Sequence, residues 1–269
     1  MGKREAFAFV AIPLLVAAII WLPPVVFLAI LGAVVLIATD ELLTMARGAG
    51  HAVGRWLPLA VTTAVLVSSW RFGLTGAAVA TIAAVIVLPS AQLLHTTSPE
   101  GSLSGVAVAT FAALYMGLAG VCLGWLRTLP DGNLGIWLVL FFLATIWIGD
   151  SGAYYVGSHL GRHRMSPRIS PNKTWEGLAG SVVTTFAAAA ALKQLFGLPF
   201  PWVHTMVLAA ILTIAAPLGD LVESQLKRDA GVKDSSSLIP GHGGLFDRTD
   251  SLIYAAPPVL GYLLAFGLI

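Results

Sequence analysis

Long apolar runs with almost no charge recur along the whole chain, and they constrain its fold more than any other feature. Of the 269 residues, 57% are hydrophobic and only 10% are charged, whereas soluble domains carry about 25% charged residues. A run of about 20 apolar residues can cross a bilayer as a helix that satisfies its own backbone hydrogen bonds. The sequence therefore predicts an all-α, polytopic helical membrane protein.

About nine segments fit membrane-spanning helices. We interpret the first as a retained helix, because Pro23-Pro24 follows it and no small-residue cleavage site is visible. The boundary between the third and the fourth is the weakest, since little more than Arg71 separates them. We expect residues 1–130 to form an N-terminal transmembrane bundle and residues 131–269 a catalytic transmembrane region. The expected spans are 6–22, 24–39, 56–70, 73–94, 103–126, 134–157, 175–196, 202–227 and 252–268.

The basic residues predict the orientation. With nine spans, twelve of the fifteen Lys and Arg residues fall on the side of the N-terminus and three on the other side. Cytoplasmic loops carry an excess of basic residues. We therefore expect a protein of the cell (inner) membrane with its N-terminus and both long polar loops in the cytoplasm and its C-terminus outside. Eight of the twelve belong to those two loops, where they could serve a functional site and not the orientation. The predicted orientation therefore also rests on the argument that such a site needs a cytoplasmic substrate.

Residues 220–250 form the most charged stretch of this apolar chain. They include four of the fifteen basic residues and six of the thirteen acidic ones. Cations neutralise phosphate oxygens, carboxylates hold a metal ion, and glycines let the backbone approach a ligand closely. The stretch therefore predicts a site for phosphates and a divalent cation.

The first part of this stretch places three polar side chains on one helix face. Asp220, Ser224 and Lys227 follow i, i+4, i+7 spacing. Pro217 precedes them and can loosen the helix there. The alternative is a helix end that dips into water, which explains Lys227 and Arg228 better than it explains Asp220.

The second part combines a glycine-rich turn with two further carboxylates. Gly243 and Gly244 follow His242 in a turn whose N–H groups could cradle an anion, while His242 is either a substrate contact or a plain turn residue. Asp247 and Asp250 are three residues apart at the start of the last span. Facing Asp220 across the bundle, they would suit Mg²⁺, which takes one or two carboxylates plus substrate phosphates.

An earlier polar stretch begins inside a predicted span. Asp150 is costly in an apolar helix unless it is paired, protonated or faces a polar cavity, and the alternative reading is a hydrogen bond between packed helices. For the basic residues of 162–168, contact with an anionic leaflet is as good an explanation as contact with substrate.

The run from Ser170 to Glu176 carries helix-start signals. Ser170-Pro171 predicts a turn, Asn172 or Thr174 can cap the next helix, and Glu176 falls in its first turn. Lys173 would then lie beside a helix N-terminus, where phosphate groups bind readily.

Taken together, these motifs resemble a known family. Ser224-Gln-Leu-Lys-Arg228, then Lys233-Asp234, then the run PGHGGLFDRTD at 240–250 are similar to the signature of phosphatidate cytidylyltransferases, also called CDP-diacylglycerol synthases. The upstream runs GDSGAYYVG and ISPNKTWEG also resemble that family, in the expected order. The resemblance covers the chain from about Trp147 onward, whereas the N-terminal half matches only in being apolar and multi-span.

The resemblance implies that CTP and phosphatidic acid react to give CDP-diacylglycerol and pyrophosphate, with Mg²⁺ required. It also implies a homodimer among membrane lipids, with a polar site facing the cytoplasm and no nucleic-acid partner. The family's metal-binding aspartates correspond to Asp220 and Asp247. Its basic and glycine-rich positions correspond to Lys227, Arg228, Lys233, His242, Gly243, Gly244 and Arg248.

We hypothesise a site that works by positioning and charge neutralisation, because the lipid phosphate is already anionic. Asp150, Asp234 and Asp250 would hold a second cation or orient basic residues. The expected catalytic residues are Asp220, Lys227, Arg228, Asp247 and Asp250. The expected substrate-binding residues are Asp150, Ser170, Asn172, Lys173, Ser224, Lys233, Asp234, His242, Gly243, Gly244 and Arg248.

Two other functions stay open on the sequence. A cytidylyltransferase for a different lipid phosphate, such as one that makes a CDP-archaeol type of product, would need the same charged groups. An ion-coupled transporter could use Asp150 and Asp220 as a relay, although no internal repeat is visible to support that class.

Overall fold

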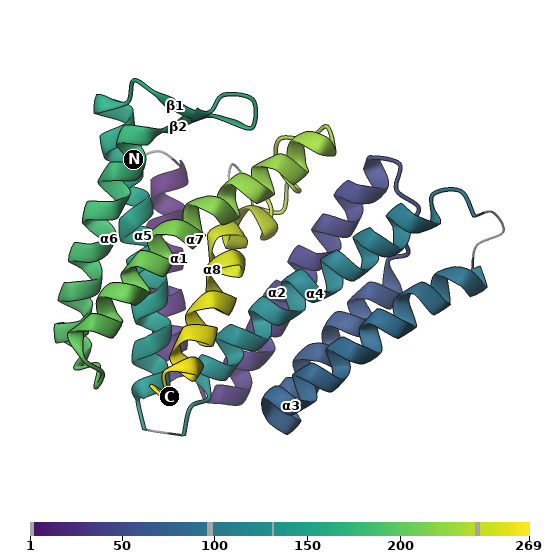
Figure 1. Cartoon of the computed structure of the whole chain (residues 1–269), viewed down its shortest axis with the longest axis horizontal. Helices are drawn as coiled ribbons and strands as arrows, with labels where there is room; N and C mark the ends of the chain where they lie inside the picture. Colours follow the sequence, from purple (N-terminus) through teal and green to yellow (C-terminus); the bar gives the residue numbers. More distant parts are fainter. Residues whose placement is uncertain (1–2, 96–98, 131, 240–242) are drawn as a thin grey trace. The chain divides into compact units, whose positions relative to one another are not determined.

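The computed structural model describes residues 3–95, 99–130, 132–239 and 243–269, and almost all of its regular structure is helical (Figure 1). Six of its helices are long and apolar enough to cross a membrane. The elements in chain order are α1 (Lys3–Trp21), α2 (Pro24–Gly48), α3 (Trp56–His95), α4 (Ser102–Arg127), α5 (Leu134–Leu160), β1 (Arg164–Ser166), β2 (Ser170–Thr174), α6 (Trp175–Phe196), α7 (Trp202–Asp229) and α8 (Phe246–Ala265).

The prediction of an all-α membrane protein is confirmed, whereas the count of nine spans is not. Each predicted run overlaps a helix, and the bounds of α6 agree with the prediction at both ends. The runs 56–70 and 73–94 are two helices that meet at Gly73 (φ 64°, ψ −154°) within the element α3. The chain turns back between them, because Ala52 before α3 and Gln92 near its end both lie beside Gly105. Glycine populates such a positive φ without steric cost, so the boundary predicted near Arg71 separates two helices, as expected.

The chain divides into two compact units. The first comprises Met1–Trp125 and Leu226–Thr249, and the second comprises Leu126–Gln225 and Asp250–Ile269. Both α7 and α8 pass from one unit into the other along the sequence. The two units are described separately below.

Close packing on glycines of α4 organises the first unit. A Cβ atom placed on Gly120 would lie 2.7 Å from Leu66 of α3 and 2.9 Å from Val35 of α2. A Cβ atom on Gly124 would lie 2.9 Å from the indole of Trp70, also of α3. Small residues let helices approach closely in lipid, so these glycines bring α2 and α3 against α4.

The second unit is built on the pair α5 and α6. Gly149 and Gly152 of α5 face the hydroxyl groups of Thr185 and Thr184 on α6, and a Cβ atom at either glycine would collide with them. From the α6 side, a Cβ atom on Gly180 would collide with the side chain of Val156. The two helices are therefore packed nearly backbone to backbone along their length.

A short antiparallel hairpin joins α5 to α6 and was not expected from the sequence. Strands β1 and β2 pair Arg164 with Thr174 and Ser166 with Ser170. The turn predicted at Ser170-Pro171 is wrong, because both residues belong to β2 and the turn lies at residues 167–169. A two-stranded hairpin has only edge strands, where a proline N atom need not donate to a partner.

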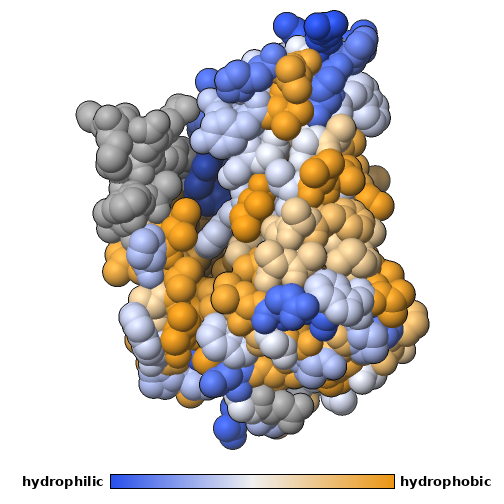
Figure 2. Space-filling model, turned by 90° about the vertical axis from the view of Figure 1, so that its left-hand side faces the viewer, coloured by the Kyte–Doolittle hydropathy of each residue, from blue (hydrophilic) through white to orange (hydrophobic). Residues whose placement is uncertain are grey.

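The surface around this hairpin fits a membrane boundary. Figure 2 shows hydrophilic atoms gathered at the top, where the hairpin lies in Figure 1, above a surface that is largely hydrophobic. Ile148 of α5 and Val183 and Leu195 of α6 are among the exposed large apolar side chains. This face of the second unit therefore suits helices in hydrocarbon with a polar hairpin outside it.

Candidate functional site

Three carboxylates of the second unit meet at a close approach of α7 to α8, and we call them the acidic cluster: Asp220 and Glu223 of α7 and Asp250 of α8. Gly219 makes the approach possible, because a Cβ atom there would lie 2.6 Å from the backbone oxygen of Asp250. One carboxylate oxygen from each residue lies within 4.8 Å of the others. The three carboxylates are thus held close enough to share one ion.

The chemistry of the acidic cluster fits a hard divalent cation. Glu223 is 2% exposed, and Asp220 and Asp250 are half-buried. The pKa of the Asp250 carboxyl is raised above its usual value, first by burial and also by the nearby negative charge of Asp220. Oxygen ligands of this kind are those that Mg²⁺ prefers.

Two side chains of the second unit hold Asp220. The Lys173 Nζ atom lies 2.8 Å from Asp220 Oδ2 and donates a hydrogen bond of 3.2 Å to the Pro217 carbonyl oxygen. Ser224 donates a hydrogen bond of 3.3 Å to Asp220 Oδ1, as the i, i+4 spacing predicts. Asp150 of α5 lies within electrostatic range of Asp220, Asp250 and Lys173. The second unit therefore brings together five of the predicted site residues.

The hairpin that carries Lys173 is held against the first turn of α6. Thr174 is the N-cap of α6 and accepts a hydrogen bond of 3.1 Å from the Gly177 N–H, so the predicted cap is confirmed. Glu176 in the first turn of α6 accepts hydrogen bonds from the backbone N–H groups of Arg162 and His163 at 3.1 and 3.2 Å. Its carboxylate also lies 2.6 Å from His163 Nδ1. These contacts hold the start of the hairpin against the start of α6.

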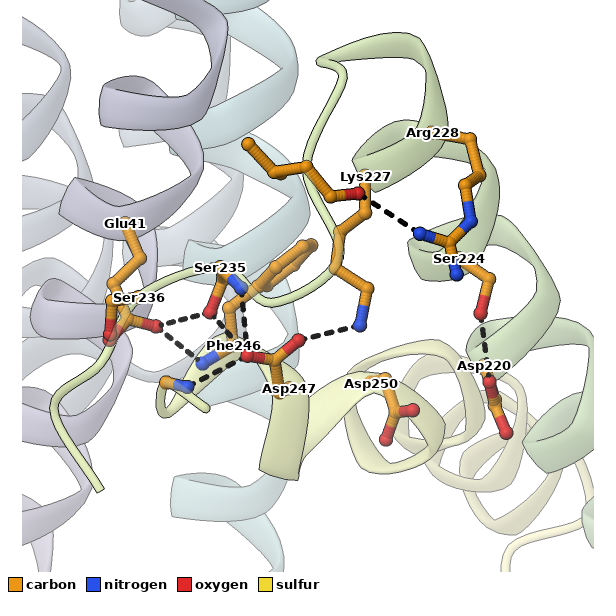
Figure 3. A network of polar contacts seen from close by, with 12 residues as sticks. Glu41, Asp220, Ser224, Lys227, Arg228, Ser235, Ser236, Phe246, Asp247 and Asp250 are labelled. Atoms are coloured by element: carbon orange, nitrogen blue, oxygen red, sulfur yellow. Dashed lines mark hydrogen bonds and ion pairs between the residues drawn. The ribbon is translucent and has the colours of Figure 1, made fainter. Parts of the chain in front are cut away.

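Asp247 occupies a different setting, in the first unit (Figure 3). Its Oδ1 atom lies 2.6 Å from Lys227 Nζ. Its Oδ2 atom accepts three hydrogen bonds, two of 2.8 Å from the N–H and the hydroxyl of Ser235 and one of 2.7 Å from the Gly244 N–H. The Asp247 side chain is 3% exposed. Donors within the first unit therefore surround this buried carboxylate.

A second buried carboxylate of the first unit, Glu41 of α2, contacts the same loop. Its two oxygens accept hydrogen bonds from the hydroxyls of Ser235 and Ser236 and from the backbone N–H groups of Leu245 and Phe246. Glu41 is 7% exposed. A residue of the N-terminal half is therefore tied to the charged signature near the C-terminus.

The remaining predicted residues have less enclosed positions. Arg228 donates a hydrogen bond of 3.2 Å to the Val232 carbonyl oxygen at the end of α7, and Gly243 has a φ of 78° that glycine tolerates. Ser170 pairs with Ser166 in the hairpin. Asn172, Lys233, Asp234 and Arg248 are exposed. His242 lies outside the described residues.

The predicted metal pair is divided between the units. Asp220 belongs to the acidic cluster of the second unit, and Asp247 belongs to the first unit, so a joint role in metal binding stays a prediction. Sequence reasoning assigned no role to Glu223 or Glu41. The i, i+3 spacing from Asp220 could have indicated Glu223, and Glu41 follows a predicted apolar span by only two residues, a position where a carboxylate needs an explanation.

Comparisons with known proteins agree with these motifs. The sequence profile described as "Cytidylyltransferase family" matches residues 2–266. The chain is 37% identical over 193 residues to a phosphatidate cytidylyltransferase of Bacillus subtilis, covering 72% of this chain and 70% of that protein. It is 35% identical over 258 residues to a phosphatidate cytidylyltransferase of Mycobacterium bovis, covering 91% of this chain and 83% of that protein.

A third relative, a phosphatidate cytidylyltransferase of Brucella suis, is 41% identical over 142 residues, which cover 53% of this chain and 52% of that protein. The profile match extends over nearly the whole chain and thus includes the N-terminal half, for which the motifs had shown no resemblance. Because the match includes both units, it also includes the acidic cluster and the buried carboxylates Glu41 and Asp247. On these grounds, the chain belongs to the cytidylyltransferase family.

Proposed function

We propose that this protein is a phosphatidate cytidylyltransferase, which makes CDP-diacylglycerol and pyrophosphate from CTP and phosphatidic acid. The observation that carries the proposal is the acidic cluster with Lys173 paired to Asp220, within a chain of this family. Carboxylates for a cation beside an ammonium group for phosphate are what the transfer of a nucleotidyl group between phosphates requires.

The reaction needs no strong base. An oxygen of the lipid phosphate, already anionic at neutral pH, attacks the α-phosphorus of CTP and forms a new P–O bond. The bond from the α-phosphorus to the oxygen that bridges to the β-phosphorus breaks, and its electron pair leaves with pyrophosphate. The task of the protein is to position two anions against each other and to offset their charge.

The acidic cluster would hold Mg²⁺ through Asp220, Glu223 and Asp250. When bound, the ion supplies charge neutralisation for the nucleotide phosphates. We assign Lys173 to a phosphate group, because its ammonium already lies beside the cluster and its backbone immediately precedes the Thr174 cap of α6. Ser224 keeps Asp220 oriented through its hydrogen bond to Oδ1.

The signature residues of the first unit supply further positive charge. By their resemblance to the family signature, we assign Lys227, Arg228, Lys233 and Arg248 to the phosphates of the two substrates. In the structure Lys227 is paired with Asp247, which fixes the direction of its ammonium group. We keep Asp247 as a second proposed metal ligand and Asp150 as a group that orients basic residues.

The setting of the reaction is also part of the proposal. A cytoplasmic supply of CTP and the excess of basic residues in the two long loops support a cell-membrane protein whose site faces the cytoplasm. We propose that residues 131–269 carry most of the reacting groups, that residues 1–130 support them, and that the protein forms a homodimer.

The test is product formation by the purified protein in mixed micelles. Radiolabelled CTP and Mg²⁺ are supplied with phosphatidic acid or with an ether-lipid phosphate, and the labelled lipid is identified. We expect CDP-diacylglycerol from phosphatidic acid, a loss of activity when a chelator removes the metal, and a loss in Asp220→Asn. Asp229→Asn is the matched control, because Asp229 is an exposed carboxylate at the end of the same helix. Labelled product from the ether lipid alone, or no labelled lipid at all, would contradict the proposal.

A further inference from the structure

Glu41 is the feature of the first unit that the proposed chemistry does not use. It lies on α2, far in sequence from the charged signature, and it is buried. We infer that Glu41 is a positioning residue for the cytidylyl transfer, which clamps the segment from Ser235 to Phe246 and thereby fixes Asp247 and Lys227. The inference rests on the proposed function and assigns a role in it to the N-terminal half of the chain.

The hydrogen bonds define the clamp. Glu41 Oε1 accepts from the Ser236 hydroxyl at 2.7 Å and from the Leu245 N–H at 3.2 Å. Glu41 Oε2 accepts from the Phe246 N–H at 2.8 Å and from the Ser235 hydroxyl at 3.1 Å. Three donors, and the one hydroxyl hydrogen that Ser235 shares with Asp247, converge on the two oxygens, and only a carboxylate offers that many acceptor positions without a donor of its own. Residues on both sides of 240–242 are therefore held by one side chain.

The clamp is connected to Asp247 through Ser235. The Ser235 hydroxyl lies 3.1 Å from Glu41 Oε2 and 2.8 Å from Asp247 Oδ2, so one hydroxyl group is shared by two carboxylates (Figure 3). Asp247 in turn lies 2.6 Å from Lys227 Nζ. The contacts therefore run from Glu41 through Ser235 and Asp247 to the Lys227 ammonium, which we assign to a substrate phosphate.

Gly244 shows how little room the clamp leaves. A Cβ atom on Gly244 would collide with the Ser235 hydroxyl and with Glu41 Oε2. The Gly244 N–H also donates to Asp247. The glycine of the signature is thus required by the position of Glu41, a residue outside the signature. This agreement between two distant parts of the sequence indicates that the segment is built around the Glu41 carboxylate.

A glutamine cannot replace Glu41 in this role. Its amide has one acceptor oxygen, so its NH₂ group would face the donors at the other position. A hydroxyl can turn to accept, but the N–H groups of Leu245 and Phe246 cannot. At least one buried backbone donor would therefore lose its partner, and the segment would shift to recover it.

The experiment compares Glu41→Gln with Asp40→Asn. Asp40 is the adjacent carboxylate on α2, and its partner is Arg55 at 2.7 Å. Asp40→Asn therefore removes the same charge from the same helix without touching the clamp. Full-length protein in mixed micelles is assayed for kcat and for KM of each substrate, per amount of folded protein. Hydrogen–deuterium exchange of the Leu245 and Phe246 amides is measured on the same samples.

We expect Glu41→Gln to lower kcat more than tenfold, to speed exchange of the two amides, and to leave the KM for CTP within threefold. Asp40→Asn should keep parental kcat and parental exchange at those amides. Glu41→Asp, which keeps the charge on a shorter side chain, should restore part of kcat. A purely structural anchor would instead lower the yield of folded protein while each folded molecule kept its kcat, and that result would overturn the inference.

The clamp and the proposed function fail separately. If the parental protein makes no CDP-diacylglycerol, the proposed function is refuted, and unchanged amide exchange in Glu41→Gln would refute the clamp independently. If Glu41→Gln does not fold, Ser236→Ala decides, because it removes one donor and leaves the carboxylate in place. Parental kcat together with parental exchange in Ser236→Ala would then overturn the inference, whereas a several-fold lower kcat with faster exchange would support it.

Discussion

Replacing Asp247 with Asn should destabilise the protein far more than the same change at Asp220, although the sequence presents the two as equivalent metal ligands. Three donors converge on Asp247 Oδ2. In Asp247→Asn the amide oxygen must stay there, which turns the amide NH₂ toward the Lys227 ammonium that now lies 2.6 Å from Oδ1. The change therefore replaces an ion pair with two opposed donors.

The burial of each pair sets the magnitude. The side chains of Lys227 and Asp247 are 13% and 3% exposed, and breaking a buried pair on one side costs about 3–5 kcal/mol. The side chains of Lys173 and Asp220 are 21% and 39% exposed. Pairs that water reaches contribute about 0–1 kcal/mol. The free energy of unfolding should therefore fall by about 2 kcal/mol or more beyond the loss in Asp220→Asn.

The assay is denaturant unfolding in mixed micelles, followed for both variants and the parental protein without added metal. Activity is measured separately at saturating Mg²⁺, where both variants should lose about 100-fold or more, since a lost charge-stabilising contact costs at least about 2.7 kcal/mol. Equal unfolding free energies for the two variants would refute the reasoning from burial. Activity within about tenfold of the parent in either variant would refute its assignment to the metal.

Three further results are expected. Lys173→Gln should lower turnover more than tenfold, and Lys173→Arg should restore it only in part, because a planar guanidinium does not replace a compact ammonium. Initial rates measured against CTP and against phosphatidate show which phosphate Lys173 contacts. Parental rates in Lys173→Gln would mean that Lys173 is only a solvated cation of the loop. Thr174→Ala should lower turnover less, since loss of a helix N-cap costs about 1 kcal/mol, and a larger loss than in Lys173→Gln would contradict this order. With Cys122 replaced, Ser237→Cys should react in intact cells with membrane-permeant but not with impermeant thiol reagents, and labelling by the impermeant reagent would place the loop outside.

Local features of the fold could be predicted from the sequence. The bounds of α6 and its Thr174 cap follow from an apolar run and a polar residue just before it. The contact of Ser224 with Asp220 follows from helical spacing. The hairpin could not be predicted, because its strands are short and rich in charged or turn-forming residues. What holds it in place is a contact outside the strands, from Glu176 at the start of α6 to the backbone of Arg162 and His163 just before β1.

The site was predictable only in part, because its long-range contacts leave no periodic signal. The carboxylates of 220–250 could be recognised as candidate ligands, but spacing alone did not show that Asp250 joins Asp220 and Glu223 while Asp247 pairs with Lys227. Asp247 and Asp250 are three residues apart and therefore neighbours on one helix face, yet the first pairs with Lys227 and the second with Asp220 and Glu223. Glu41 and Ser235 are 194 residues apart, and no pattern within either segment indicates the other.

The position of Glu41 also has a consequence for the synthesis of the protein. Its serine partners are translated 194 or more residues later, which at about 5–20 residues per second is roughly 10–40 s. During that interval α2 carries a carboxylate whose final donors do not yet exist. A carboxylate is costly inside hydrocarbon, but Glu41 lies in the last two turns of α2, close to Arg47, where a nascent helix can leave it in the headgroup layer. Insertion of the N-terminal helices and closure of the clamp are thereby separated in time, and a segment translated much later completes the burial of a carboxylate in α2.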